Sequence, residues 1–196
     1  MDNREEESNV TYIQEILKKY VETDQDPLPL DLKQFEKDTN FTDPHELYPN
    51  ARSMKRKIVY HGGPTNSGKT YEALQRLKMA SGMGGIYCGP LRLLALEVYE
   101  KLNIDGIFCQ LVTGQDKRYI PSSLHTSCTI EMCNIDKVYD VAVLDEIQLI
   151  SDTERGWAWT RAFLGLQAYE IHVCGSMEAA GTVGHLMFST DLYLHF

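Results

Sequence analysis

Residues 63–70 read Gly63-Pro64-Thr65-Asn66-Ser67-Gly68-Lys69-Thr70, which satisfies the pattern G-x-x-x-x-G-K-[ST]. A β-rich run, Ile58–His61, precedes this stretch, and a run with helical spacing, Tyr71–Met79, follows it. Strand, glycine-rich loop and helix is the context that a phosphate-binding P-loop requires. The glycines let backbone N–H groups face phosphates, the helix dipole adds positive potential, and Lys69 would neutralise the β and γ phosphates. We therefore predict that residues 63–70 bind ATP, with the Thr70 hydroxyl as a ligand of Mg²⁺.

A second motif further along the chain reads Val141-Ala142-Val143-Leu144-Asp145-Glu146-Ile147-Gln148. Its four apolar residues predict a buried strand that ends in two carboxylates. Ligands collect at the carboxyl ends of parallel strands, so we expect Asp145 beside the P-loop, holding the magnesium shell. Glu146 would then act as general base on the attacking water. Gln148 could sense the γ-phosphate or cap the following turn, and the sequence supports both readings equally.

From Lys57 onward, short β-rich runs alternate with stretches of helical spacing. The predicted strands are Ile58–His61, Gly85–Cys88, Ile107–Val112, Ser127–Ile130, Val141–Leu144 and Ile171–Cys174. The predicted helices between them are Tyr71–Met79, Leu91–Leu102 and Trp157–Ala168. Such alternation predicts an α/β fold of the P-loop NTPase type, with a parallel sheet covered by helices. Trp157 and Trp159 are assigned to packing within the last of these helices.

The chain divides into three parts by composition. Residues 1–50 are an acidic extension with one predicted helix, Val10–Val21, and they carry most of the net charge of −9. Residues 51–176 form the predicted nucleotide-binding domain. Residues 177–196 show no convincing period and are expected to be either a last strand pair or disordered.

Composition limits the classes of protein that fit. With 196 residues, of which 43% are hydrophobic, the chain can fill one principal core. No run approaches the roughly 18 consecutive apolar residues of a membrane span, so we expect no membrane partner. Five cysteines without a Cys-x-x-Cys pair predict buried free thiols and no zinc. These cysteines are Cys88, Cys109, Cys128, Cys133 and Cys174.

Several stretches recur, in this order, in one known family. They are His61–Thr70, Gly89–Ala95, Leu111–Gln115, Thr129–Met132, Asp145–Gln148 and Arg155–Arg161. Through them, from about Phe41 to Gly175, the chain resembles the suppressor-of-Var mitochondrial RNA helicases, which belong to the DExH-box superfamily two. The resemblance implies a RecA-like lobe and an ATP-driven motor that moves 3′ to 5′ along single-stranded RNA beside an exoribonuclease.

The resemblance also implies particular contacts with RNA. Pro90, Arg92, Thr113, Gly114 and Thr129 match the segments that touch the nucleic-acid backbone in such motors, and Cys174-Gly175-Ser176 matches the motif that couples hydrolysis to movement. By residue type alone, Arg92 fits a solvated charge, Thr113-Gly114 an ordinary turn and Thr129 any strand. The resemblance points to the mitochondrial matrix, or to the nucleus, although the acidic start of the chain is unlike a mitochondrial presequence.

Two alternatives stay open on the sequence. A thymidine-kinase-type deoxynucleoside kinase also pairs a P-loop with Asp-Glu-x-Gln, but it carries a cysteine-paired zinc site. A truncated, non-catalytic lobe would share every motif with the helicase. Superfamily two motors place ATP between two lobes, and the second supplies arginines worth about 10³ to 10⁵ in rate, so a first lobe alone is expected to bind nucleotide and hydrolyse it slowly.

Overall fold

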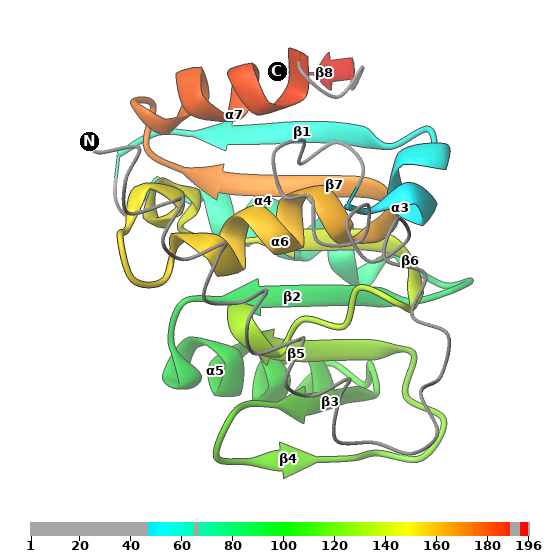
Figure 1. Cartoon of the computed structure of the whole chain (residues 1–196). Coiled ribbons are helices and arrows are strands. Elements are labelled where there is room, and N and C mark those ends of the chain that lie inside the picture. The colour runs from blue at the N-terminus through cyan, green and yellow to red at the C-terminus, as the bar shows by residue number, and fades with distance from the viewer. Residues whose placement is uncertain (1–46, 65–66, 189–192, 196) are drawn as a thin grey trace, which may run out of the picture. The chain divides into compact units, whose positions relative to one another are not determined.

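The computed structural model of the chain describes residues 47–64, 67–188 and 193–195. Their strands form one sheet in the order β4-β3-β5-β2-β6-β7-β1-β8, in which only the β3–β4 pairing is antiparallel (Figure 1). In chain order the strands are β1 (Lys57–Gly62), β2 (Gly85–Gly89), β3 (Cys109–Val112), β4 (Lys117–Arg118), β5 (His125–Thr129), β6 (Val138–Leu144), β7 (Gln167–Gly175) and β8 (Tyr193–His195).

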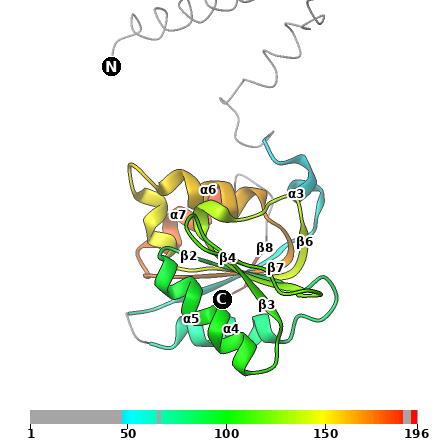
Figure 2. The same cartoon turned by 90° about the horizontal axis from the view of Figure 1, so that it is seen from below.

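Helices cover both faces of this sheet. They are α3 (Pro49–Ser53), α4 (Lys69–Lys78), α5 (Arg92–Ile104), η1 (Ile130–Met132), η2 (Ile147–Ser151), α6 (Gly156–Gly165) and α7 (Ala179–Phe188). Seen along the sheet, α4 and α5 lie on one side of it, and α3, α6 and α7 lie on the other (Figure 2). None of the helices in the described ranges is long and apolar enough to cross a membrane.

The two faces of the sheet build two hydrophobic cores. Val141 and Val143 of β6 pack against α4 and α5, whereas Ala142 and Leu144 of the same strand pack on the α6 side. Because successive side chains of a strand point to opposite faces, a strand buried on both sides is apolar throughout. This explains why the parallel strands appear in the sequence as short continuous apolar runs. The α/β prediction, with a parallel sheet between helices, is confirmed.

The strand and helix predictions differ from the structure mainly at their ends. β3 begins at Cys109 rather than Ile107, and Ile130 opens η1 instead of closing β5. The predicted helix Trp157–Ala168 was too long, because α6 ends at Gly165 and Ala168 lies in β7. Leu166 is extended (ψ 125°), and the buried guanidinium of Arg56 donates hydrogen bonds to three carbonyls at this helix end, those of Phe163, Leu164 and Leu166.

Of the two possibilities left open for the C-terminal stretch, a last strand pair or partial disorder, the strand pair is wrong. Ala179–Phe188 is helical, and only Tyr193–His195 forms a strand, which pairs in parallel with β1. Ala179 and Val183 pack into the core on the α6 side. At the other end, Val10–Val21 lies outside the described residues, and Tyr48 and α3 already pack on the domain.

The tryptophans of α6 have different environments. Trp159 is fully buried, as predicted, but Trp157 is 58% exposed, so its assignment to packing was wrong. The helix presents one face to the sheet, and Trp157 lies on the other. All five cysteines are buried and free, which confirms the prediction of buried thiols.

The parallel arrangement brings the carboxyl ends of six strands to one edge of the sheet. In spatial order these are β3, β5, β2, β6, β7 and β1. Ligands of open α/β sheets bind at this edge. The P-loop and Asp145–Gln148 follow two of these strand ends, and the segments at Pro90, Thr113 and Thr129 lie at three others, so the fold gathers them along a single edge.

Candidate functional site

The glycine-rich loop joins β1 to α4. The N–H of Gly63 donates to the carbonyl of Gly175 (3.3 Å), which ties the start of the loop to the end of β7. Gly68 has φ +87°, a left-handed conformation that glycine adopts without strain, and it is followed directly by α4. No side chain caps this helix, so its first N–H groups and the positive end of its dipole point into the loop. Thr65 and Asn66 lie outside the described residues.

The Lys69 ammonium folds back over the loop that precedes it. It donates to the carbonyls of Gly63 (2.8 Å) and Pro64 (2.6 Å) and lies 3.5 Å from the Ser67 hydroxyl. A positive charge therefore lies against the backbone carbonyls of the loop. This is where a phosphate chain bound by the loop N–H groups would need neutralising charge.

Asp145 meets the P-loop from the end of β6. Its Oδ1 accepts hydrogen bonds from the Thr70 hydroxyl (3.1 Å) and the Glu146 N–H (3.1 Å), and its Oδ2 accepts one from the Tyr87 hydroxyl (2.9 Å). Burial raises the pKa of this carboxyl above its ordinary value, while the bonds from Tyr87 and Thr70 lower it and only partly offset the burial. Burial, and next the neighbouring Asp145, raise the pKa of Tyr87, which therefore remains a hydrogen-bond donor.

Glu146 and Gln148 form the wall of the site opposite Thr70. Glu146 has φ +52°, which is uncommon for a residue with a side chain and typical of constrained functional positions. The Gln148 amide donates to the Glu146 carboxylate, and its oxygen accepts the Ser176 N–H (3.3 Å). Gln148 thus bridges the second motif and the segment after β7, and neither of these contacts caps the following turn.

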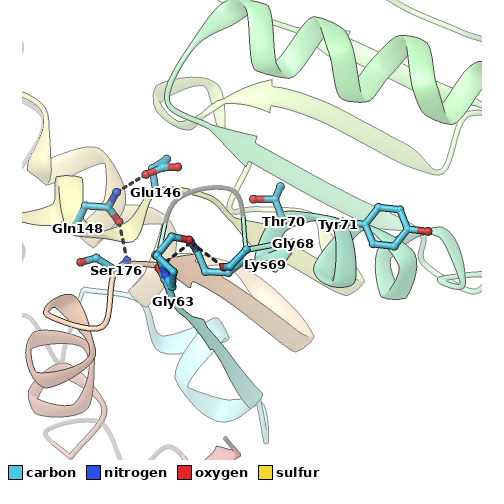
Figure 3. A pocket seen from close by; sticks show the side chains of 11 residues that line it. Gly63, Gly68, Lys69, Thr70, Tyr71, Glu146, Gln148 and Ser176 are labelled. Atoms are coloured by element: carbon cyan, nitrogen blue, oxygen red, sulfur yellow. Dashed lines mark hydrogen bonds between the residues drawn. The ribbon is translucent and has the colours of Figure 1, made fainter.

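These groups surround a cavity of about 500 Å³. It is lined by Gly63, Pro64, Ser67, Gly68, Lys69, Thr70, Tyr71, Glu146, Gln148, Gly175 and Ser176. Glu146, Gln148 and Ser176 lie at one end and Tyr71 at the other, with Lys69 and the loop between them (Figure 3). The structure therefore brings Lys69, Thr70, Asp145, Glu146 and Gln148 together, as the two motifs predicted.

The residues suggested for RNA lie along the other half of the same edge. Pro90 follows β2, Thr113 and Gly114 follow β3, and Thr129 ends β5. Arg92 begins α5, is exposed, and donates to the side chain of Gln115 (2.7 Å). No side chain caps the N-terminus of α5, whose N-cap residue is Leu91. Uncapped helix N–H groups beside an arginine suit a backbone phosphate.

Thr113 cannot offer its hydroxyl to a ligand in this arrangement. Its side chain is buried, and its Oγ1 exchanges hydrogen bonds with the backbone of Asp116, both at 2.9 Å. It shapes the turn that leaves Gly114 exposed, so the Thr113-Gly114 segment would meet a ligand through its backbone.

Two residues of the edge, Tyr87 and Arg155, had no role in the sequence predictions, and Ser176 had one only through the family resemblance, as part of Cys174-Gly175-Ser176. Tyr87 and Ser176 contact Asp145 and Gln148 from neighbouring strands, and Arg155 bonds to the carbonyl of Pro90 (2.7 Å) and to Glu131. Because these contacts depend on strand order and register, only residues inside the recurring stretches, such as Arg155, carried any signal in the sequence.

A known family description matches residues 44–195, namely the DEXQ-box helicase domain of Suv3. The chain belongs to the Suv3 family of DEXQ-box helicase domains. The match includes α7 and β8, so the likeness to the Suv3 family extends beyond Gly175, where the sequence resemblance had ended. The deoxynucleoside kinase alternative does not fit this family.

Curated relatives of the Suv3 domain carry names of the same kind. The chain is 56% identical over 174 residues to the mitochondrial DExH-box ATP-dependent RNA helicase DExH18 of Arabidopsis thaliana, covering 87% of this chain and 22% of that protein. It is 53% identical over 151 residues to the human mitochondrial ATP-dependent RNA helicase SUPV3L1, covering 75% of this chain and 19% of that protein. The chain therefore spans about a fifth of the length of these relatives.

A solved structure shares the fold of this chain. The complex of S. cerevisiae dbp5 with ADP and other partners superposes with a TM-score of 0.50 at 16% identity, covering 86% of this chain and 52% of that chain. At this identity the likeness concerns the fold alone, and it agrees with a RecA-like sheet flanked by helices.

Proposed function

We propose that this chain is the ATP-binding motor lobe of a mitochondrial ATP-dependent RNA helicase. The observation that carries the proposal is the meeting of Thr70 and Asp145 at 3.1 Å beside the Lys69 ammonium, at the mouth of a P-loop. Family membership and the names of the relatives support the same activity. The mitochondrial location also follows from those names.

The nucleotide would lie along the cavity with its phosphates on residues 63–70. Backbone N–H groups of the loop and the first turn of α4 would hold the β and γ phosphates, and Lys69 would exchange its contacts with the loop carbonyls for phosphate oxygens. The terminal phosphate of the nucleotide would then face Glu146 and Gln148, at the end of the cavity opposite Tyr71 (Figure 3).

The Thr70 hydroxyl and the Asp145 carboxylate fit a magnesium ion. Mg²⁺ prefers oxygen ligands, commonly one or two carboxylates together with substrate phosphates, and these two oxygens already meet beside the loop. A cation there would also offset the burial that raises the pKa of Asp145. Bound at this position, Mg²⁺ would neutralise charge on the phosphates.

Glu146 is the group placed to accept a proton from water attacking the γ-phosphate. Its carboxylate lines the cavity and receives a hydrogen bond from Gln148, which orients it. Because Gln148 also binds the N–H of Ser176, a change at the γ-phosphate would reach the segment after β7. This supports γ-phosphate sensing by Gln148 over capping of the turn.

Single-stranded RNA would run along the ends of β2, β3 and β5. The exposed Arg92, the uncapped N-terminus of α5 and the backbone at Gly114 offer donors to phosphates and little to bases, while Pro90, which has no N–H to donate, and Thr129 would line the same path. We therefore expect weak sequence preference. The 3′ to 5′ polarity and the exoribonuclease partner remain proposals that rest on the family resemblance.

ATP hydrolysis by the purified chain, with and without single-stranded RNA, tests this function. No arginine lines the described part of the cavity, so we expect slow turnover that RNA increases. The increase should vanish in Lys69→Ala and persist in Lys55→Ala, which changes an exposed lysine ahead of β1, at the end of that strand away from the P-loop. Equal turnover in Lys69→Ala and the parent chain would refute the proposal.

A further inference from the structure

Arg155 joins two strand ends on the RNA side of the edge. Its Nε and Nη2 both donate to Glu131 Oε1, at 2.9 and 2.7 Å, and Nη2 also donates to the carbonyl of Pro90 at 2.7 Å. Pro90 follows β2, while Glu131 lies in η1, two residues after the end of β5. A single guanidinium therefore holds together two of the segments that we assign to the RNA backbone.

The same side chain contacts the nucleotide half of the edge through one neighbour. The guanidinium carbon lies 5.5 Å from the ring centroid of Trp159, which is four residues further along the chain and on the same face of α6. Trp159 is fully buried, and its indole N–H donates to the backbone carbonyl of Asp145 (3.0 Å). Asp145 in turn accepts from Thr70 of the P-loop. Contacts thus run without a gap from Pro90 to the P-loop.

The N–H groups ahead of α6 do not depend on the Arg155 guanidinium. Asp152 already satisfies the N–H groups of Glu154 and Arg155 (2.9 and 2.7 Å) ahead of this helix. The side chains of Arg155 and Glu131 are 42% and 30% exposed, and an ion pair this accessible adds little to stability. A role in communication between the RNA side and the P-loop accounts for both features. Trp159 is buried and hydrogen-bonded to Asp145, and Arg155 donates three hydrogen bonds to the segments after β2 and β5.

We propose that Arg155 and Trp159 are positioning residues that couple RNA binding to the geometry of Asp145. A phosphodiester anion at the strand ends offers Arg155 an alternative to Glu131, and movement of the guanidinium changes its contact with Trp159. The bond from Trp159 to the Asp145 carbonyl then carries the change to the group that faces Thr70. This inference rests on the proposed function, because it requires RNA at that edge and nucleotide at the P-loop.

The test measures linkage between the two ligands. The dissociation constant of a fluorescent oligouridine is determined with and without magnesium adenylyl imidodiphosphate, a non-hydrolysable ATP analogue. The parent is Trp157→Phe, which leaves Trp159 as the only tryptophan of the chain and removes an exposed ring outside these contacts. We expect the analogue to change RNA affinity about 5-fold or more in this parent, at the lower end of ordinary coupling.

The measured quantity is the ratio of the RNA dissociation constants with and without the analogue. Arg155→Gln and Arg155→Lys in the same parent should bring this ratio close to one. Both variants lose the two-pronged contact with Glu131, and Arg155→Lys retains the charge, so the loss should follow geometry rather than net charge. Affinity for the analogue alone should stay within about 2-fold. RNA should change Trp159 emission in the parent and leave it unchanged in both variants, a response that a merely structural role would not produce.

The outcomes separate this inference from the proposed function. A parent that binds neither the analogue nor RNA would overturn both. A parent that binds both without linkage, or variants with normal melting temperatures that keep the full ratio and the emission response, would overturn the inference and leave the proposed function standing. If Arg155→Gln does not fold, Arg155→Lys decides the question by the same two readings.

Discussion

Asp145 meets two opposing requirements. The residue is 5% exposed, and burial raises the pKa of its carboxyl, so the charged form is disfavoured in the folded chain. Between the unfolded pKa and this raised value, the folded state binds more protons than the unfolded state. Stability therefore falls as pH rises through that window, and the loss is complete above the folded pKa. The ionised Asp145 carboxylate therefore lowers the stability of the free chain at the position where a cation would bind.

Asp145→Asn should consequently stabilise the free chain at neutral pH. An asparagine can keep the contacts with Thr70 and the Glu146 N–H without a buried charge. We expect its melting temperature at pH 7.5 to equal or exceed that of the parent, and the difference to shrink at an acidic pH, below the raised pKa, at which the carboxyl is protonated. Thermal unfolding at both pH values measures this effect. A variant that melts well below the parent at pH 7.5 would contradict it.

Glu146→Gln separates chemistry from binding. The amide can still accept the bond from Gln148 but cannot take a proton from water. We expect hydrolysis to fall by about 10² to 10⁴, the usual contribution of a general base, and nucleotide affinity to stay within about 2-fold. Single-turnover kinetics and equilibrium titration of the same samples measure the two effects. Glu100→Gln, on the exposed side of α5, is the control and should leave both unchanged.

For individual residues, the sequence predicted well the site residues that belong to contiguous motifs, and it predicted poorly the partners that they contact from distant parts of the chain. Lys69, Thr70, Asp145 and Glu146 belong to short motifs whose strand, loop and helix are encoded locally, and the structure brings them together. Thr113 shows the limit of a motif, since the residue follows β3 at the edge of the sheet but its hydroxyl is used within the turn. Ser176 reaches Gln148 only through the packing of β7 beside β6.

Among the elements, α6 shows how packing overrides a local pattern. Apolar spacing predicted a helix to Ala168, but the helix ends at Gly165, against Tyr48 and above the guanidinium of Arg56. The helix Ala179–Phe188 was likewise not predicted from the sequence, because it has no clear polar face and so no local period that would reveal it. Trp157 and Trp159 lie on opposite sides of α6, because a helix turns about 200° over two residues, so the helical period itself argued against assigning both to packing.

Gly165→Ala tests this helix end. A Cβ at Gly165 would lie 2.8 Å from Cδ1 and 3.0 Å from Cε1 of the Tyr48 ring, so we expect a loss of about 1–3 kcal/mol from overpacking. Gly181→Ala, in α7, is the matched control because no atom lies within 4 Å of its added Cβ. That variant should be neutral or more stable by up to about 1 kcal/mol.

Chemical denaturation of the two alanine variants measures the comparison. Tyr48→Ala combined with Gly165→Ala should recover part of the loss, because the ring that the new methyl meets is gone. Equal stability of Gly165→Ala and Gly181→Ala would show that the end of α6 is not set by its contact with Tyr48.

For the whole domain, strand order assigns a task to each half of one edge. The order β6-β7-β1 gathers the nucleotide groups, and β3-β5-β2 gathers the residues proposed for RNA, with Arg155 and Trp159 between them. Alternation of strands and helices predicted a parallel sheet. It could not predict which strands are neighbours, because pairing and register depend on contacts between residues far apart in the chain.

The central claim is that residues 63–70 and Asp145 form a site for Mg-ATP, and equilibrium titration of the purified chain with ATP tests it most directly. The account predicts saturable binding that requires Mg²⁺, weakens by at least about 10-fold in Lys69→Ala, and is unaffected in Lys117→Ala. Binding that is absent, or that is equally tight in Lys69→Ala or without Mg²⁺, would contradict it.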